Sequence, residues 1–149
     1  MRKWIDLPPL WLALTLLIAW GISRVMPGLG FGGAWAGWVG AGLVGAGLLL
    51  MALAAATMMA ARTTVIPHRN PSALVTGGVF RLSRNPIYLG DALVLAGFIL
   101  RWDAVPALVL VPAFVWLIDR RFIRAEEARL RAAFGDSFEA WAARTRRWI

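Results

Sequence analysis

Cysteine and glutamine are absent from this chain of 149 residues, and histidine and tyrosine occur once each. Without cysteine the chain can form no disulfide, no thiolate nucleophile and no cysteine-ligated metal site. One histidine cannot supply the several imidazole ligands of a histidine-based metal centre. We therefore expect no bound metal.

Charged residues are also scarce, at 16% of the chain, whereas 60% of the residues are hydrophobic. Residues 28–61 carry no charge at all, and other apolar runs approach the length of about 20 residues that crosses a bilayer. The length suits a single domain, residues 1–149. The composition therefore predicts an all-α integral membrane protein.

The hydropathy pattern predicts about four membrane helices. Runs at 7–22 and 35–61 predict two full spans, which would form an N-terminal bundle over residues 1–61. Two shorter runs, 87–100 and 104–118, predict a compact helical hairpin.

The positive side chains are unevenly distributed among the connections. Fourteen of the sixteen lie in the N-terminus, in the loop that follows the second span or in the tail (119–149), and only Arg24 and Arg101 lie elsewhere. Because positively charged loops stay in the cytoplasm, we expect both termini, the central loop and the tail helices on the cytoplasmic side of the cell (inner) membrane. This sorting explains the net charge of +8 without a nucleic-acid partner.

Small residues recur at every fourth position from just before the second span into its first half, at Gly33, Gly37, Ala41 and Gly45. Such a ridge lets another helix approach closely, either within the chain or in a dimer. We expect packing within the chain, and hence a monomer.

The chain's one histidine, its one tyrosine and its two asparagines all lie in one polar stretch, residues 67–88. Within it, Asn85-Pro86 predicts a helix start, with Asn as the cap and Pro in the first helical position. The free backbone N–H groups of such a start attract anions. Gly77 and Gly78 predict a turn that lets the backbone approach a ligand closely. We expect a binding site here.

Two adjacent carboxylates lie on the first helix of the tail. At 100° per residue, Glu126 falls in the middle of an apolar stripe, and Glu127 falls at its edge, within reach of Arg124 and Arg131. We therefore expect Glu127 to be structural. Glu126 would face the protein, where it needs a buried arginine or the ammonium group of a ligand. The stripe consists of Phe122, Ile123, Leu130, Ala133 and Phe134.

Gly135 predicts the end of that helix, and Asp136 or Ser137 would cap the next one. The final helix would place Phe138, Trp141, Thr145 and Trp148 on one face and its arginines elsewhere. This pattern is typical of a helix that lies on an anionic membrane surface.

Asp91 lies inside the first arm of the hairpin, one turn beyond Tyr88. A carboxylate in a membrane segment is a functional candidate, because burying it unpaired is costly. The alternative, which we favour, is a structural bond to an arginine such as Arg84.

Several short motifs occur in a fixed order: LVTGGVF at 74–80, RNPIYLG at 84–90, the pair Glu126-Glu127, FG at 134–135 and RW at 147–148. In this order and spacing they resemble the membrane methyltransferases that include isoprenylcysteine carboxyl methyltransferase and phospholipid N-methyltransferases. The resemblance covers residues 63–149 and implies a cofactor-binding catalytic half, residues 62–149. The implied cofactor is S-adenosylmethionine, with S-adenosylhomocysteine as the product.

The resemblance implies a site shared by the loop and the tail. Arg84, Tyr88 and Glu126 would be catalytic, with Arg84 positioning an anionic group of the substrate. The expected cofactor-binding residues are His68, Ser72, Ala73, Leu74, Val75, Gly78, Phe80, Asn85, Pro86, Ile87, Tyr88, Glu126 and Glu127.

The acceptor implied by the resemblance is a hydrophobic or lipid-like molecule, either a carboxylate like that of isoprenylcysteine or a phospholipid amine. Phe122 stands where the eukaryotic prenylcysteine enzymes carry a substrate-binding arginine. Two other interpretations remain. One is a sterol-reductase-like or non-catalytic relative, the reductase using NADPH, and the other is a small transporter that depends on Asp91.

Overall fold

A computed structural model describes residues 6–66 and 69–149, so the predicted cofactor residue His68 lies outside the described residues. Every regular element within these ranges is helical, as predicted. The elements are α1 (Pro8–Val25), α2 (Trp35–Ala60), η2 (Gly78–Arg81), α3 (Pro86–Arg101), η3 (Val105–Val109), α4 (Leu110–Ile118), η4 (Asp119–Ile123), α5 (Arg124–Phe134) and α6 (Asp136–Arg144).

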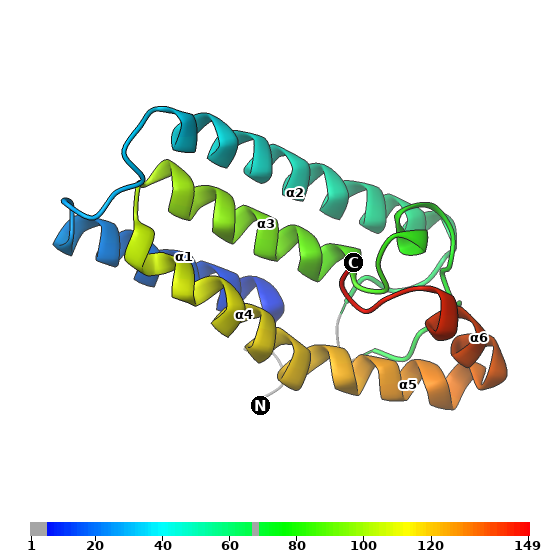
Figure 1. The fold of residues 1–149 in the computed structure, drawn as a ribbon. Coiled ribbons are helices and arrows are strands. Elements are labelled where there is room, and N and C mark those ends of the chain that lie inside the picture. Colours follow the sequence, from blue (N-terminus) through cyan, green and yellow to red (C-terminus); the bar gives the residue numbers. More distant parts are fainter. Residues whose placement is uncertain (1–5, 67–68) are drawn as a thin grey trace.

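Helix α3 is the central element of the molecule. It lies between α2 on one side and α1 with α4 on the other (Figure 1). Helix α4 continues through the π-helical turn η4 into α5, and α6 folds back at the far end of α5 (Figure 1). The polar loop after α2 therefore lies at the same end of the molecule as α5 and α6 (Figure 1).

Helices α1 and α2 are, among the described residues, the ones long and apolar enough to cross a membrane. They have 18 and 26 residues, and no more than 17% of the most apolar part of either helix is buried. A core helix of a soluble protein would instead be hydrophobic and covered. The two predicted spans therefore coincide with helices that are long and apolar enough to cross a membrane. Helices α3 and α4 are shorter, with 16 and 9 residues.

Four glycines form the contact between α2 and α3. A Cβ atom on Gly47 would lie 2.6 Å from the Gly90 carbonyl oxygen, and one on Gly97 would lie 2.6 Å from the Gly40 carbonyl oxygen. These helices therefore approach so closely that no side chain fits between their backbones.

The predicted small-residue ridge is not this contact. A Cβ atom on Gly37 or Gly45 would meet nothing within 4 Å, and Ala41 is exposed. Packing within the chain does use small residues, but α2 buries Ala36, Gly40, Gly47 and Ala54. The choice of face was wrong because α2 carries small residues all around, so their spacing could not show which side meets α3.

The final helix also differs from its prediction. Phe138 and Trp141 are buried in a cluster with Ala54 and Phe80, so the apolar face of α6 packs against the protein. Helix α6 ends at Arg144, and Thr145 has extended backbone angles, so Trp148 does not belong to that face. Phe80 gives the tail an apolar partner that the sequence pattern of α6 could not reveal.

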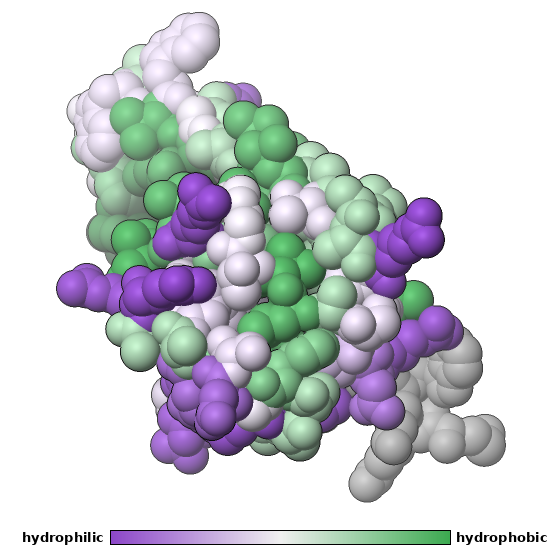
Figure 2. Space-filling view, turned by 90° about the vertical axis from the view of Figure 1, so that its right-hand side faces the viewer, coloured by the Kyte–Doolittle hydropathy of each residue, from purple (hydrophilic) through white to green (hydrophobic). Residues whose placement is uncertain are grey.

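The end face that carries the loop and α6 is polar at its edges. Hydrophilic side chains gather around a strip of apolar and near-neutral ones (Figure 2). The charged side chains thus gather at this end of the molecule, whereas α1 and α2 expose many large apolar side chains.

Candidate functional site

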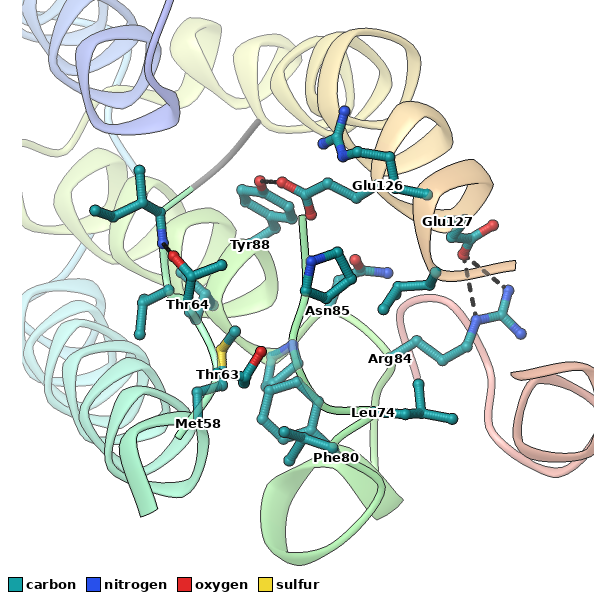
Figure 3. Close-up of a pocket in the computed structure, with 18 of the residues that line it drawn as sticks. Met58, Thr63, Thr64, Leu74, Phe80, Arg84, Asn85, Tyr88, Glu126 and Glu127 are labelled. Atoms are coloured by element: carbon teal, nitrogen blue, oxygen red, sulfur yellow. Dashed lines mark hydrogen bonds and ion pairs between the residues drawn. The ribbon is translucent and has the colours of Figure 1, made fainter. Parts of the chain in front are cut away.

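A cavity of about 260 Å³ lies between the loop that follows α2, the start of α3 and α5 (Figure 3). Its wall is mainly apolar, with a few polar side chains. Helices α1 and α2 contribute to it as well, so the cavity extends beyond the predicted catalytic half, residues 62–149. The lining includes Pro8, Pro9, Met51, Met58, Thr63, Thr64, Leu74, Val75, Phe80, Ile87, Tyr88, Asp91, Glu126, Arg129, Leu130 and Trp141.

The start of α3 is fixed by the C-terminal tail. The backbone N–H of Arg84 donates to the Arg146 carbonyl at 2.9 Å, and the Ser83 hydroxyl donates to the Arg147 carbonyl at 3.2 Å. Pro86 is the first residue of α3, as predicted. The Asn85 side chain does not cap the helix, however, because its amide donates to the Arg147 carbonyl at 3.0 Å. Asn85 therefore joins the tail to α3.

Tyr88 and Glu126 form a direct contact on the cavity wall. The Tyr88 hydroxyl donates to Glu126 Oε1 at 2.7 Å, and the tyrosine is only 6% exposed (Figure 3). Phe122 packs beside the tyrosine ring, with 6.4 Å between the ring centroids. Glu126 therefore faces the protein, as predicted, and Tyr88 sets the direction of its carboxylate.

Glu127 lies between two arginines from distant parts of the chain. Arg84 Nη2 donates to Glu127 Oε1 at 3.1 Å, and Arg147 Nη2 donates to Glu127 Oε2 at 2.6 Å. Arg147 also donates to Asp119 at 3.1 Å. We call these four side chains, Arg84, Asp119, Glu127 and Arg147, the arginine–carboxylate network.

The network fixes the charge of Glu127. Burial raises the pKa of this carboxyl, but the hydrogen bonds and charges of Arg147 and Arg84 outweigh burial, so the pKa lies below its usual value. The structural role predicted for Glu127 agrees with this geometry, whereas its predicted partners were wrong. Arg131 bonds Glu139, and Arg124 bonds Asp119. Helical spacing shows only local partners and could not indicate Arg84 and Arg147.

The burial of the two glutamates also differs from what their places in the apolar stripe suggest. Glu127 is 6% exposed and is the more deeply buried of the two, although it was expected at the edge of the stripe. Burial in the protein is decided here by the tail and by Arg84, which cover the side of α5 that carries Glu127.

Asp91 does not bond Arg84, so its favoured structural role was wrong. All three guanidinium nitrogens of Arg84 are used by Glu127 and by the carbonyls of Ala142 and Thr145. Asp91 instead lines the cavity and is 2% exposed.

Most of the predicted site residues within the described chain line the cavity. Ser72 and Gly78 do not: the Ser72 hydroxyl donates to the Arg62 carbonyl at 2.8 Å, and Gly78 lies against Thr57 with a φ of +56°. The predicted residues on the wall are Ala73, Leu74, Val75, Phe80, Arg84, Asn85, Pro86, Ile87, Tyr88, Glu126 and Glu127.

Several lining residues were not anticipated from the sequence. Arg129 follows Glu126 by three positions on α5, a spacing that places both on one side of a helix, so this one could have been found. Met51, Met58 and Pro8 come from the first two helices, where nothing in an apolar sequence marks a cavity wall.

The model of the family described as phospholipid methyltransferase matches residues 35–137, more than half of the chain. No curated protein matches the chain, and no solved structure does. The family match includes α2, the loop, α3 and the Glu126-Glu127 pair, which are the segments that enclose most of the cavity. The chain therefore belongs to the phospholipid methyltransferase family.

Proposed function

We propose that this protein is an integral membrane methyltransferase that uses S-adenosylmethionine and transfers its methyl group to a hydrophobic or lipid-like acceptor. The observation that carries this proposal is the Tyr88–Glu126 pair on the wall of a mainly apolar cavity. Both residues belong to segments that the methyltransferase family model matches. The cavity thus combines an oriented carboxylate with apolar surface.

The residues on the wall fit the methyl donor. Its cationic amino end requires a carboxylate, which Glu126 supplies, and its adenine ring requires apolar contacts such as those of Leu74, Val75 and Phe80. When bound, S-adenosylmethionine supplies a methyl group already activated by its attachment to a positively charged sulfur. We propose Ala73, Asn85 and Ile87 as further contacts.

The protein's own contribution is position and the exclusion of water. Tyr88 holds the Glu126 carboxylate, and the arginine–carboxylate network holds α5 against the start of α3. The apolar wall keeps water away from the reacting groups. Because every guanidinium nitrogen of Arg84 is already bonded to Glu127 or the tail, we assign Arg84 to holding this arrangement rather than to the substrate.

We also propose that the loop, α5 and α6 face the cytoplasm, in the cell (inner) membrane. Arg24 lies in the last turn of α1 and Arg101 ends α3, and these helix ends lie at the end of the molecule opposite the loop (Figure 1). The other fourteen positive side chains lie in the N-terminus, the loop and the tail. This arrangement supports the orientation, since positive charge favours the cytoplasmic side.

Calorimetric titration of the purified protein with S-adenosylhomocysteine tests the proposed cofactor. We expect binding by the wild type and a loss of affinity of about tenfold or more in Glu126→Gln, because a hydrogen bond to a charged group is worth about 1.5–3 kcal/mol. Glu139→Gln, an exposed carboxylate bonded to Arg131, is the matched control and should bind normally. Binding of NADPH in place of S-adenosylhomocysteine would support the reductase interpretation instead.

A further inference from the structure

A second hollow, of about 370 Å³, lies between the loop and the end of α6. It shares no lining residue with the candidate cavity. The loop and η2 contribute three of its residues, and the end of α6 with the residue that follows contributes two: Thr76, Gly77, Arg81, Arg144 and Thr145. We call it the loop–tail hollow.

The two arginines of the loop–tail hollow have no counter-charge. Among the described residues neither Arg81 nor Arg144 takes part in an ion pair or a side-chain hydrogen bond, and no carboxylate lines the hollow. By contrast, Arg124, Arg131 and Arg147 each bond a carboxylate. Two positive side chains that border one hollow repel each other, and an anion between them would remove this repulsion.

Thr145 gives the hollow a buried hydroxyl group. The residue is only 5% exposed, and its side chain makes no hydrogen bond among the described residues. No enclosed side-chain oxygen of the described chain is without a partner, so this hydroxyl opens to the hollow instead. The backbone of Thr145 is fixed on both sides, because its N–H donates to the Trp141 carbonyl at 3.0 Å and its carbonyl accepts from Arg84 at 2.9 Å. The hydroxyl is therefore held in place for a ligand.

The donor groups of the hollow fit a phosphate. Guanidinium groups only donate, and the side chains of Thr76 and Thr145 add two hydroxyls, so four side chains from two segments surround the space with donors. A tetrahedral phosphate has oxygens in several directions and carries up to two negative charges, and arginine matches its geometry with paired N–H groups.

The surroundings indicate where such a phosphate comes from. Leu82 follows Arg81 and is 70% exposed, so an apolar side chain lies on the surface next to the hollow. The loop and α6 lie at the end of the molecule that we place at the cytoplasmic surface of the membrane (Figure 1). Anionic lipid headgroups lie there beside apolar chains, a combination that free phosphate in water does not offer.

We propose that the loop–tail hollow is a phosphate-binding site in which Arg81 and Arg144 neutralise the phosphate and Thr145 donates a hydrogen bond to it. The phosphate belongs to a lipid headgroup at the membrane surface. Bound there, it joins the loop to the tail, the segments that also contribute to the candidate cavity and to the arginine–carboxylate network. The site takes no part in the chemistry of methyl transfer.

Thermal unfolding of the purified protein in a nonionic detergent tests the ligand. Dioctanoyl phosphatidic acid and dioctanoylglycerol differ only in the phosphate, and inorganic phosphate provides the same group without lipid chains. We expect phosphatidic acid to raise the unfolding temperature, dioctanoylglycerol to leave it unchanged, and inorganic phosphate to act only at higher concentration. An equal response to inorganic phosphate and phosphatidic acid would overturn the lipid source and assign the hollow to free phosphate.

Variants test the site itself. Replacing both arginines, Arg81→Gln with Arg144→Gln, should weaken the affinity for phosphatidic acid about 100-fold or more, because each loses a hydrogen bond between charged groups. Thr145→Val should weaken it about tenfold, and Thr145→Ser should restore it. Arg24→Gln with Arg146→Gln removes the same charge from two exposed arginines outside the hollow and is the matched control.

Three results would overturn the phosphate site: an unchanged affinity in the double arginine variant, an equal loss in the matched control, or equal stabilisation by dioctanoylglycerol and phosphatidic acid. The second result would mean that any positive surface attracts the lipid. None of these measurements involves the methyl donor, so they remain decisive even if the protein fails to bind S-adenosylhomocysteine.

Discussion

The contact between α2 and α3 and the arginine–carboxylate network hold the molecule together by opposite means. In the helix contact, side chains are missing: Gly40, Gly47, Gly90 and Gly97 bring two backbones together. In the network, long charged side chains join residues 84, 119, 127 and 147. One region relies on close packing of neutral surfaces, and the other on ion pairs centred on a buried carboxylate.

The difference follows from the surroundings of each region. Apolar helices gain little hydrophobic energy by leaving lipid, so close contact between backbones must hold them together. At the loop end, the tail has to be attached to α3 and α5, and bidentate arginines provide directional bonds for this. The candidate cavity lies between the two regions, with α3 supplying Tyr88 and Asp91 and α5 supplying Glu126. The geometry of the site therefore depends on both.

Removal of Glu127 should have the largest effect. Glu127→Ala removes the carboxylate that Arg84 and Arg147 share and leaves Asp119 as a partner of Arg147 only, and we expect a loss of about 3 kcal/mol in the free energy of unfolding. This is the lower end of the cost of breaking a buried ion pair, because Arg147 is 34% exposed. Denaturant unfolding in detergent, followed by tryptophan fluorescence, measures the change.

The exposed pair of Arg131 and Glu139 provides the control for that comparison. Both side chains are more than half exposed, so Glu139→Ala should cost less than about 1 kcal/mol. An equal loss in the two variants would show that the network contributes no more than an ordinary surface pair.

Filling the glycine contact should have the next largest effect. In Gly97→Ala the new methyl group would lie 2.6 Å from the Gly40 carbonyl oxygen, so α2 and α3 must separate. We expect a loss of about 1–3 kcal/mol, the usual cost of overpacking. Gly45→Ala, where a Cβ meets nothing within 4 Å, should be neutral or stabilising. If both variants unfold alike, backbone approach is not what holds these helices.

These two regions also differ in how far the sequence predicts them. Hydropathy predicts α1 and α2. Local backbone preferences, which act within a few residues, predict the break at Gly135 and the start of α3 at Pro86. The partner surface of α2 and the partners of Glu127 depend on segments distant along the chain. Neither follows from spacing alone.

The candidate site shows the same division. The inward direction of Glu126 could be predicted, because it is a carboxylate on an apolar stretch. The bond from Tyr88 to Glu126 could not, since it joins residues 38 positions apart, one on α3 and the other on α5. The continuous helix from α4 through η4 to α5, which brings Glu126 there, was expected as two separate elements.

Acid should weaken the network and spare the glycine contact. The pKa of Glu127 is lower in the folded protein than its ordinary value of 4.5, so its stabilising contribution is present above that value and is lost as pH falls toward the folded pKa. We expect the unfolding temperature of the wild type to fall more steeply below about pH 4.5 than that of Glu127→Gln, which cannot titrate. Gly97→Ala should follow the wild-type slope, because no titratable group changes. A common slope in all three proteins would exclude Glu127 as the source of the acid sensitivity.

The smallest effect should come from Tyr88→Phe, at the point where the two regions meet. The substitution removes one hydroxyl and its 2.7 Å bond to Glu126 but leaves the ring packed beside Phe122. A hydrogen bond of this kind is worth about 1 kcal/mol, so stability should change little. The Glu126 carboxylate loses the group that sets its direction, and we expect S-adenosylhomocysteine affinity to fall about fivefold, the equivalent of that energy. A loss of binding without a loss of stability would show that the bond orients the site, whereas a loss of stability alone would place it with the structural contacts around it.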